Sequence, residues 1–203
     1  MKRAGLELLT VMFVACSVVV SSAQAPQGRE GGQGREGRGR GRGPAAPACT
    51  TLACDFQAEW DRSREMIINI ADAMPDDKFS FKPTPAQRSF GEQVMHIVQV
   101  DTNFLATLGG KTPKPTINMQ ATSKADVMAA LRQSMDWATA VIKEFNDQQL
   151  MERVMSVPFM GPMTSRLRIL SFDLGHSQDI YGQMAVYLRL NGITPPASRR
   201  GGL

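Results

Sequence analysis

The sequence predicts an all-α fold, a four-helix bundle in which four amphipathic segments pack around one core. Apolar residues recur in each of these segments at helical spacing over roughly 20 positions. Glycine and proline residues separate the segments, and none of them shows a convincing alternation of apolar and polar residues. The four segments lie within residues 52–196, a length typical of a single domain with a single core.

The first two helices are delimited by a proline, a capping motif and a pair of glycines. The first is expected over residues 55–74, where apolar side chains return to one face and a proline follows. Residues 76–87 contain two further prolines and are expected to be an extended or turned connector. The second helix is expected over residues 89–108, because Ser89 and Glu92 form a capping box and two consecutive glycines follow.

The last two helices each follow a long connector. Ser123 is an expected N-cap, and the third helix is expected over residues 124–145. Residues 148–163 contain glycine and prolines and are expected to be a loop with a short extended piece at residues 153–157. The fourth helix is expected over residues 164–190, before an Asn-Gly pair and two consecutive prolines. Both connectors are long enough for a crossover, so a simple up-down-up-down order is not assured.

The first 23 residues have the features of a secretory signal peptide. Two basic residues precede an apolar stretch at residues 6–20, and small residues follow, so we expect cleavage after Ala23. The apolar stretch is shorter than the roughly 20 residues of a permanent membrane helix. Lipoprotein anchoring at Cys16 is not expected, because the usual aliphatic residue three positions earlier is absent. We therefore expect an exported protein, periplasmic or secreted, with no stable membrane span.

Residues 24–51 are expected to be a disordered leader rich in Gly and Arg, because they offer few apolar side chains to bury. Residues 1–49 hold seven Lys and Arg and three Asp and Glu, which leaves 16 of each kind in the remainder of the chain. The folded part is therefore neutral overall, and nothing in it indicates a nucleic-acid partner. Residues 197–203 are expected to be a flexible tail.

Two cysteines, Cys49 and Cys54, remain after removal of the signal peptide. In an oxidising compartment a pair at this spacing can close a small loop, and here it would join the leader to the start of the first helix. The alternative interpretation, half of a metal site, requires further ligands nearby that the sequence lacks. The sequence therefore predicts a disulfide bond.

Two sequence blocks indicate a family. Residues 79–83 and 88–97 read FSFKP and RSFGEQVMHI, and residues 176–192 read HSQDIYGQMAVYLRLNG before two prolines. In this order they resemble the second and last helices of the DinB-like family. The resemblance implies a four-helix bundle in the family's up-down-down-up order, often assembled as a homodimer. Characterised members include thiol transferases, hydrolases and isomerases, and many have no assigned reaction.

The same resemblance places a divalent metal on one histidine of the second helix and on two histidines, four residues apart, of the fourth. The chain's two histidines, His96 and His176, match the first two of these ligand positions. The third position is Ile180, which cannot bind a metal. Neutral imidazole is a good ligand for zinc, nickel or iron, but two neutral ligands alone hold a divalent ion weakly.

Three interpretations of the two histidines follow. An oxygen ligand on the fourth helix completes a variant metal site, with Asp179 as the first candidate and Asp173 or Gln183 as others. Alternatively, the site has lost its metal and keeps a pocket for binding. In the third interpretation each histidine is a hydrogen-bonded core residue, which is what an isolated helical histidine usually is.

The functional hypothesis is an exported DinB-like protein that acts as a metal-dependent hydrolase or thiol transferase. The bundle contains no cysteine nucleophile, serine elbow or glycine-rich phosphate loop, so the chemistry would rest on a metal or a bound thiol. Export disfavours the transferase, because low-molecular-weight thiols are mainly cytosolic. The alternative is a non-catalytic module for small-molecule binding or dimerisation, with a metal-free pocket.

Overall fold

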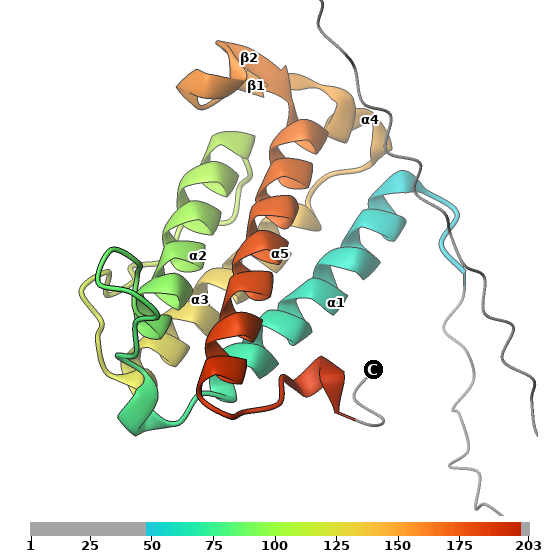
Figure 1. Ribbon diagram of the computed structural model, residues 1–203. Helices are drawn as coiled ribbons and strands as arrows, with labels where there is room; N and C mark the ends of the chain where they lie inside the picture. The colour runs from blue at the N-terminus through green and yellow to red at the C-terminus, as the bar shows by residue number, and fades with distance from the viewer. Residues whose placement is uncertain (1–47, 200–203) are drawn as a thin grey trace, which may run out of the picture. The chain divides into compact units, whose positions relative to one another are not determined.

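Four long helices form the body of the protein in a computed structural model that describes residues 48–199 (Figure 1). They are α1 (Leu52–Asp72), α2 (Phe90–Leu105), α3 (Lys124–Ile142) and α5 (Arg166–Leu190). The predicted four-helix bundle is therefore confirmed. The predicted signal peptide, most of the predicted leader and the last four residues lie outside the described part. None of the described helices combines the length and apolar character needed to cross a bilayer.

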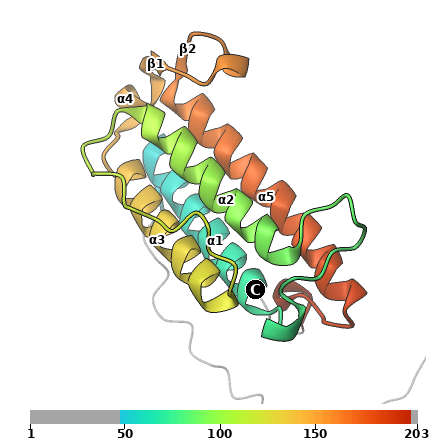
Figure 2. The same ribbon diagram turned by 90° about the vertical axis from the view of Figure 1, so that its left-hand side faces the viewer.

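The helices follow an up-down-down-up order. Figure 2 shows that α2 and α3 run in one direction and that α1 and α5 run in the other. Both α1 and α2 pack against α3 and α5, which makes α1 and α2 diagonal neighbours. Because α2 and α3 are parallel, the connection between them must return along the bundle, and residues 109–123 supply its length.

Side-chain caps set where the helices begin. Ser89 accepts a hydrogen bond from the Glu92 amide, and the Glu92 carboxylate accepts one from the Ser89 amide, so the predicted capping box is present. Ser123 caps α3 as expected. The first helix begins earlier than predicted, because the Thr51 hydroxyl accepts from the Cys54 amide and provides its cap. Cys49 and Cys54 are joined by the predicted disulfide.

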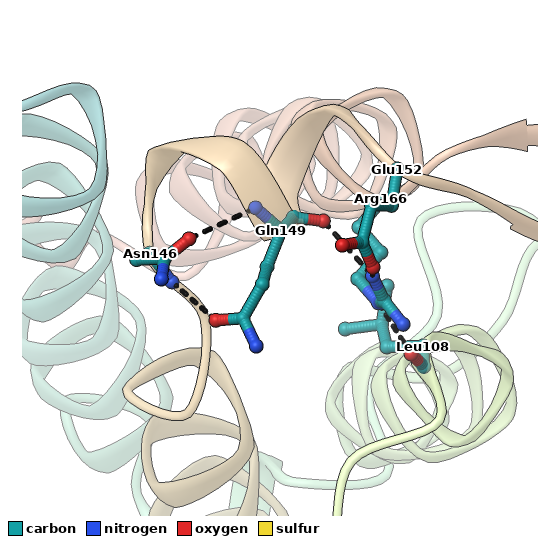
Figure 3. Close-up of polar contacts among 5 residues, drawn as sticks. All are labelled: Leu108, Asn146, Gln149, Glu152 and Arg166. Atoms are coloured by element: carbon teal, nitrogen blue, oxygen red, sulfur yellow. Dashed lines mark hydrogen bonds and ion pairs between the residues drawn. The ribbon is translucent and has the colours of Figure 1, made fainter.

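The segment before α5 contains structure that the sequence prediction missed. Residues 148–163 were expected to be a loop, but α4 (Asp147–Met151) precedes a hairpin of β1 (Arg153–Met155) and β2 (Met163–Ser165). Asn146 and Gln149 form a capping box that begins α4, as Figure 3 shows. The expected extended piece corresponds to β1. Its partner β2 is too short to show an alternating pattern, and α5 begins only after it.

The bundle core has two apolar clusters with a buried polar layer between them. One cluster includes Phe90 and Tyr187, and the other includes Trp60 and Trp137. Between the clusters along α1, α2 and α5 lie polar side chains that are almost completely buried; we call them the polar layer, and they are Ser63, Asp101, Asp173 and Ser177. In the sequence of α5 this layer adjoins His176.

Candidate functional site

The two histidines of the chain lie in direct contact between α2 and α5. The Nε2 atoms of His96 and His176 are 3.1 Å apart. The rings meet edge to face, with their centroids 4.9 Å apart and an angle of 73° between their planes. Both residues are half-buried. The two residues that the sequence indicated as a shared site are therefore side by side.

Their surroundings favour neutral imidazoles. Burial lowers the pKa of His96, and the charges of Arg88 and His176 lower it further. Burial also lowers the pKa of His176, against an opposing effect of the Asp179 carboxylate, and Arg88 again lowers it. At pH 7 one ring nitrogen of the pair therefore donates and the other accepts. In either arrangement His176 Nδ1 is buried without a hydrogen-bond partner among residues 48–199.

The Asp179 carboxylate is hydrogen bonded within its own helix. Its Oδ2 accepts from Gln183 Nε2 at 2.8 Å, and Gln183 Oε1 accepts from Gln93 Nε2 of α2 at 2.7 Å. The Tyr187 hydroxyl donates to the main-chain oxygen of Arg88 at 2.8 Å. The bond between Gln93 and Gln183 joins α5 to α2, and the Tyr187 bond joins α5 to the residues just before α2. Asp179 influences His176 through its charge, as the pKa of His176 shows.

The position of the expected third ligand belongs to the core. Ile180 is 2% exposed and packs in the same apolar cluster as Phe90 and Tyr187. Within residues 48–199, no three His, Cys, Asp or Glu side chains are gathered closely enough to hold a metal ion. The structure thus brings together the two histidines but not a third ligand. Asp179 as that ligand remains a prediction.

Two carboxyl groups of the polar layer lie near the histidines in sequence but are fully buried. Asp173, named from the sequence as a possible oxygen ligand, has no hydrogen-bond partner among the described residues for either carboxyl oxygen. Within the described part of the chain, Asp101 of α2 accepts only a long bond of 3.5 Å from Ser177 Oγ. Sequence reasoning missed Asp101, although an aspartate on the apolar face shared by Val98 and Leu105 is a detectable anomaly.

A surface pocket of about 590 Å³ borders His96. It lies between α2, the connector before it and the crossover after it. Its lining residues are Lys82, Pro85, Ala86, Gln87, Arg88, Glu92, Met95, His96, Gln99, Met119 and Gln120. Lys82 is paired with Glu92 at 3.1 Å, whereas Arg88 is exposed and forms no ion pair with the described residues. The pocket therefore offers His96 a polar approach with a positive charge beside it.

The arrangement has two chemical capacities. Two neutral imidazole nitrogens at this separation can share one divalent cation, because imidazole in its neutral form is the metal-binding form. They can also pass a proton between donor and acceptor, which suits acid and base catalysis. Both capacities depend on the antiparallel contact of α2 and α5.

Comparison with known proteins identifies relatives of this fold. The model of the DinB superfamily matches residues 59–184. A DinB-like protein from Bacillus cereus is 21% identical, with a TM-score of 0.59, and the match covers 72% of this chain and 96% of that one. No curated protein matches the sequence.

Two solved structures from Bacillus subtilis are also similar. The DinB-like protein YjoA is 21% identical, with a TM-score of 0.56 over 69% of this chain and 93% of that one. YfiT is 13% identical, with a TM-score of 0.55 over 74% of this chain and 94% of that one. YfiT is described as a probable metal-dependent hydrolase with an unusual four-helix bundle topology. At these identities the similarity establishes the fold.

Proposed function

The chain belongs to the DinB superfamily, and on that premise we propose that it is a hydrolase whose divalent metal is held by His96 and His176, with Asp179 as the third ligand. The separation of 3.1 Å between the two Nε2 atoms carries this proposal. Two nitrogens that each lie about 2.0–2.1 Å from a tetrahedral zinc ion are separated by roughly 3.3 Å. The observed separation fits that requirement, and the lowered pKa of each histidine keeps its nitrogen available as a ligand.

The chemistry of the proposed site combines this metal with groups of the chain. A divalent ion with an open coordination position brings the pKa of a bound water towards neutrality, which is what hydrolysis requires. His96 and His176 hold the site between two helices, and Asp179 raises the basicity of His176. Arg88 places a positive charge beside the pocket at His96, where it suits a substrate with an anionic group. The description of YfiT as a probable metal-dependent hydrolase supports this assignment.

A second candidate function is binding of a small molecule without a metal. The burial of Ile180 in the apolar core favours it, because a third ligand is then lacking at that position. Among enzymatic alternatives, the thiol transferase is disfavoured by the proposed export. The disulfide between Cys49 and Cys54 supports export, since such bonds persist in oxidising compartments.

Metal analysis of the purified protein separates the two functions. We expect about one equivalent of bound zinc or nickel per chain after growth in metal-replete medium, and its loss in His176→Ala. The matched control is Gln178→Ala, because Gln178 lies on the same helix but donates to Ser63 of α1. Hydrolysis of a chromogenic ester should depend on the same metal and the same histidine. Protein that stays metal-free under these conditions would contradict the hydrolase and leave the binding function.

A further inference from the structure

An exposed apolar surface lies at the end of the bundle where the hairpin projects. We call it the hairpin patch, and it consists of Met155, Phe159, Met163 and Phe172. Met155 is 78% exposed and Phe159 is 64% exposed. Figure 2 shows the hairpin of β1 and β2 extending beyond the helices at this end. Side chains of this size are rarely left exposed together without a binding role.

The patch is packed against the bundle by three aromatic rings. Phe159, in the turn between the strands, lies 5.8 Å from Phe104 of α2 and 5.1 Å from Phe172 of α5, between ring centroids. Phe104 and Phe172 are stacked, with centroids 5.3 Å apart and planes 11° from parallel. The turn of the hairpin thus packs against α2 and α5. The rings of Phe159 and Phe172 nevertheless remain partly exposed to solvent.

The base of the hairpin is fixed by Arg166. Its guanidinium donates to the main-chain oxygens of Leu108 and Gln149 and to the Glu152 carboxylate, as Figure 3 shows. The main-chain amide of Arg166 also donates to the main-chain oxygen of Glu152 at 3.1 Å. Residues 152 and 166 flank the two strands, so this contact network holds the hairpin in a defined direction.

Two of the arginines around the patch have no acidic partner among the described residues. Residues 153–172 contain three arginines and no acidic residue. Arg166 is paired with Glu152, but Arg153 and Arg168 are exposed and donate to the main-chain oxygens of Met163 and Met160. No carboxylate within residues 48–199 forms an ion pair with either of these two arginines. The apolar patch is therefore bordered by two unneutralised cations.

We propose that the hairpin patch docks on the surface of an anionic lipid bilayer. Phe159 and Met155 would enter the boundary between headgroups and acyl chains, and Arg153 and Arg168 would contact lipid phosphates. A second copy of this chain is a poorer occupant, because a two-fold interface would set the same cations against each other with no carboxylate between them. This docking does not depend on the proposed hydrolase.

Docking would also orient the histidine site. Phe172 and His176 lie four residues apart on α5, which corresponds to about 6 Å along the helix axis. His176 therefore lies about one helical turn along α5 from Phe172, and His96 contacts His176.

A tryptophan reporter at the tip tests the proposal in the full chain. In Phe159→Trp, vesicles of phosphatidylcholine mixed with phosphatidylglycerol should shift the emission to the blue, and brominated acyl chains should quench it. Val186→Trp is the matched control, because Val186 is 51% exposed on α5 outside the patch. The native tryptophans, Trp60 and Trp137, are 3% and 7% exposed and provide a constant background.

Vesicle affinity supplies the second measurement. Replacement of Arg153 or Arg168 by Gln should weaken binding to the anionic vesicles about fivefold each, and added salt should reduce it further. The double variant Met155→Ser, Phe159→Ser should bind the vesicles roughly tenfold or more weakly, whereas Val186→Ser should leave the affinity unchanged. Residues 1–47 are common to all variants and cannot produce these differences.

Two results would overturn the proposal. One is an unshifted emission of Phe159→Trp on anionic vesicles at low salt. The other is a dimer that Phe159→Ser dissociates while vesicle binding stays the same, which would make the patch an interface between copies of this chain.

Discussion

Asp101 of α2 and Asp173 of α5 are both completely buried, and the charge of Asp101 helps to raise the pKa of Asp173. Burial raises the pKa of Asp101 to about 8, against an opposing effect of the hydrogen bond from the Ser177 hydroxyl. Burial also raises the pKa of Asp173 well above the ordinary aspartate value. Asp101 is therefore protonated in the folded protein at neutral pH, and Asp173 holds its proton to a higher pH than an ordinary aspartate, in a layer that divides the apolar core.

Because of this pair, we expect the free energy of unfolding to decrease as the pH rises. In the unfolded chain both aspartates ionise near pH 4, whereas in the folded chain Asp101 retains its proton up to about pH 8 and the pKa of Asp173 is raised in the same direction. The folded state thus binds more protons between these values, and the free energy of unfolding should decrease across that window. Below pH 4 both states are protonated, so the free energy of unfolding no longer changes with pH and the contribution of the pair to stability is fully present there.

Asp101→Asn and Asp173→Asn test this dependence, because asparagine keeps the shape without the ionisable group. We expect each variant to be more stable than the wild type at pH 8, by at least about 1 kcal/mol, and to show a flatter pH profile. Urea denaturation followed by circular dichroism between pH 4 and pH 8 measures both. An unchanged slope in both variants would show that the pair does not cause the dependence.

The second prediction concerns the core residue at the expected third ligand position. Ile180→His adds an imidazole one helical turn beyond His176 and should raise zinc or nickel affinity about tenfold or more. The new side chain enters an apolar cluster, so the variant should also lose stability. Isothermal titration with the metal measures the gain.

Met184→His is the control for this gain, because Met184 is equally buried on α5 but lies one turn further along. Its substitution should carry a similar loss of stability and no gain in affinity. Equal metal affinity in both variants would mean that the contact of His96 with His176 does not mark a metal site.

The third prediction concerns the contact network at the base of the hairpin. Arg166→Ala removes donors to Leu108, Gln149 and Glu152 and also the guanidinium stacked 4.7 Å from the Phe145 ring centre. We expect a loss of about 2–3 kcal/mol in chemical denaturation. Arg166→Lys should recover little of it, because one ammonium cannot reach three acceptors in this geometry. Full recovery by lysine would indicate that only the charge matters.

The sequence predicted the bundle well because its signals are local. The capping box of Ser89 and Glu92, the cap at Ser123 and the apolar periodicity all act within a few residues of one another. The hairpin escaped prediction because it depends on distant partners. Its strands pair over three residues each, and Arg166 joins them to α4 and to Leu108 in the turn after α2.

The candidate site was predictable only in part, for a similar reason. The contact of His96 and His176 follows from two family blocks, and the structure places their nitrogens together. The burial of Asp101 against α5 depends on the rotation of α2 about its axis, which neither composition nor spacing determines closely. The sequence showed that Ile180 stands at the position of the expected third ligand. It did not show that the Ile180 side chain packs in the apolar core.

The fourth prediction concerns close packing at the start of α2, where Gly91 lies against Phe79. A Cβ at position 91 would approach the Phe79 ring at 2.9 Å, and the Gly91 amide donates to the main-chain oxygen of Phe79 at the same separation. Gly91→Ala should therefore destabilise the protein by about 1–3 kcal/mol, and Phe79→Leu in the same chain should recover part of this loss.

Gly182→Ala is the matched control, because a Cβ there has no neighbour within 4 Å, and alanine should stabilise α5 by about 0.5–1 kcal/mol. Thermal and urea unfolding of the four proteins measure these effects. Equal effects of alanine at both glycines would mean that helix propensity, and not the contact with Phe79, governs position 91.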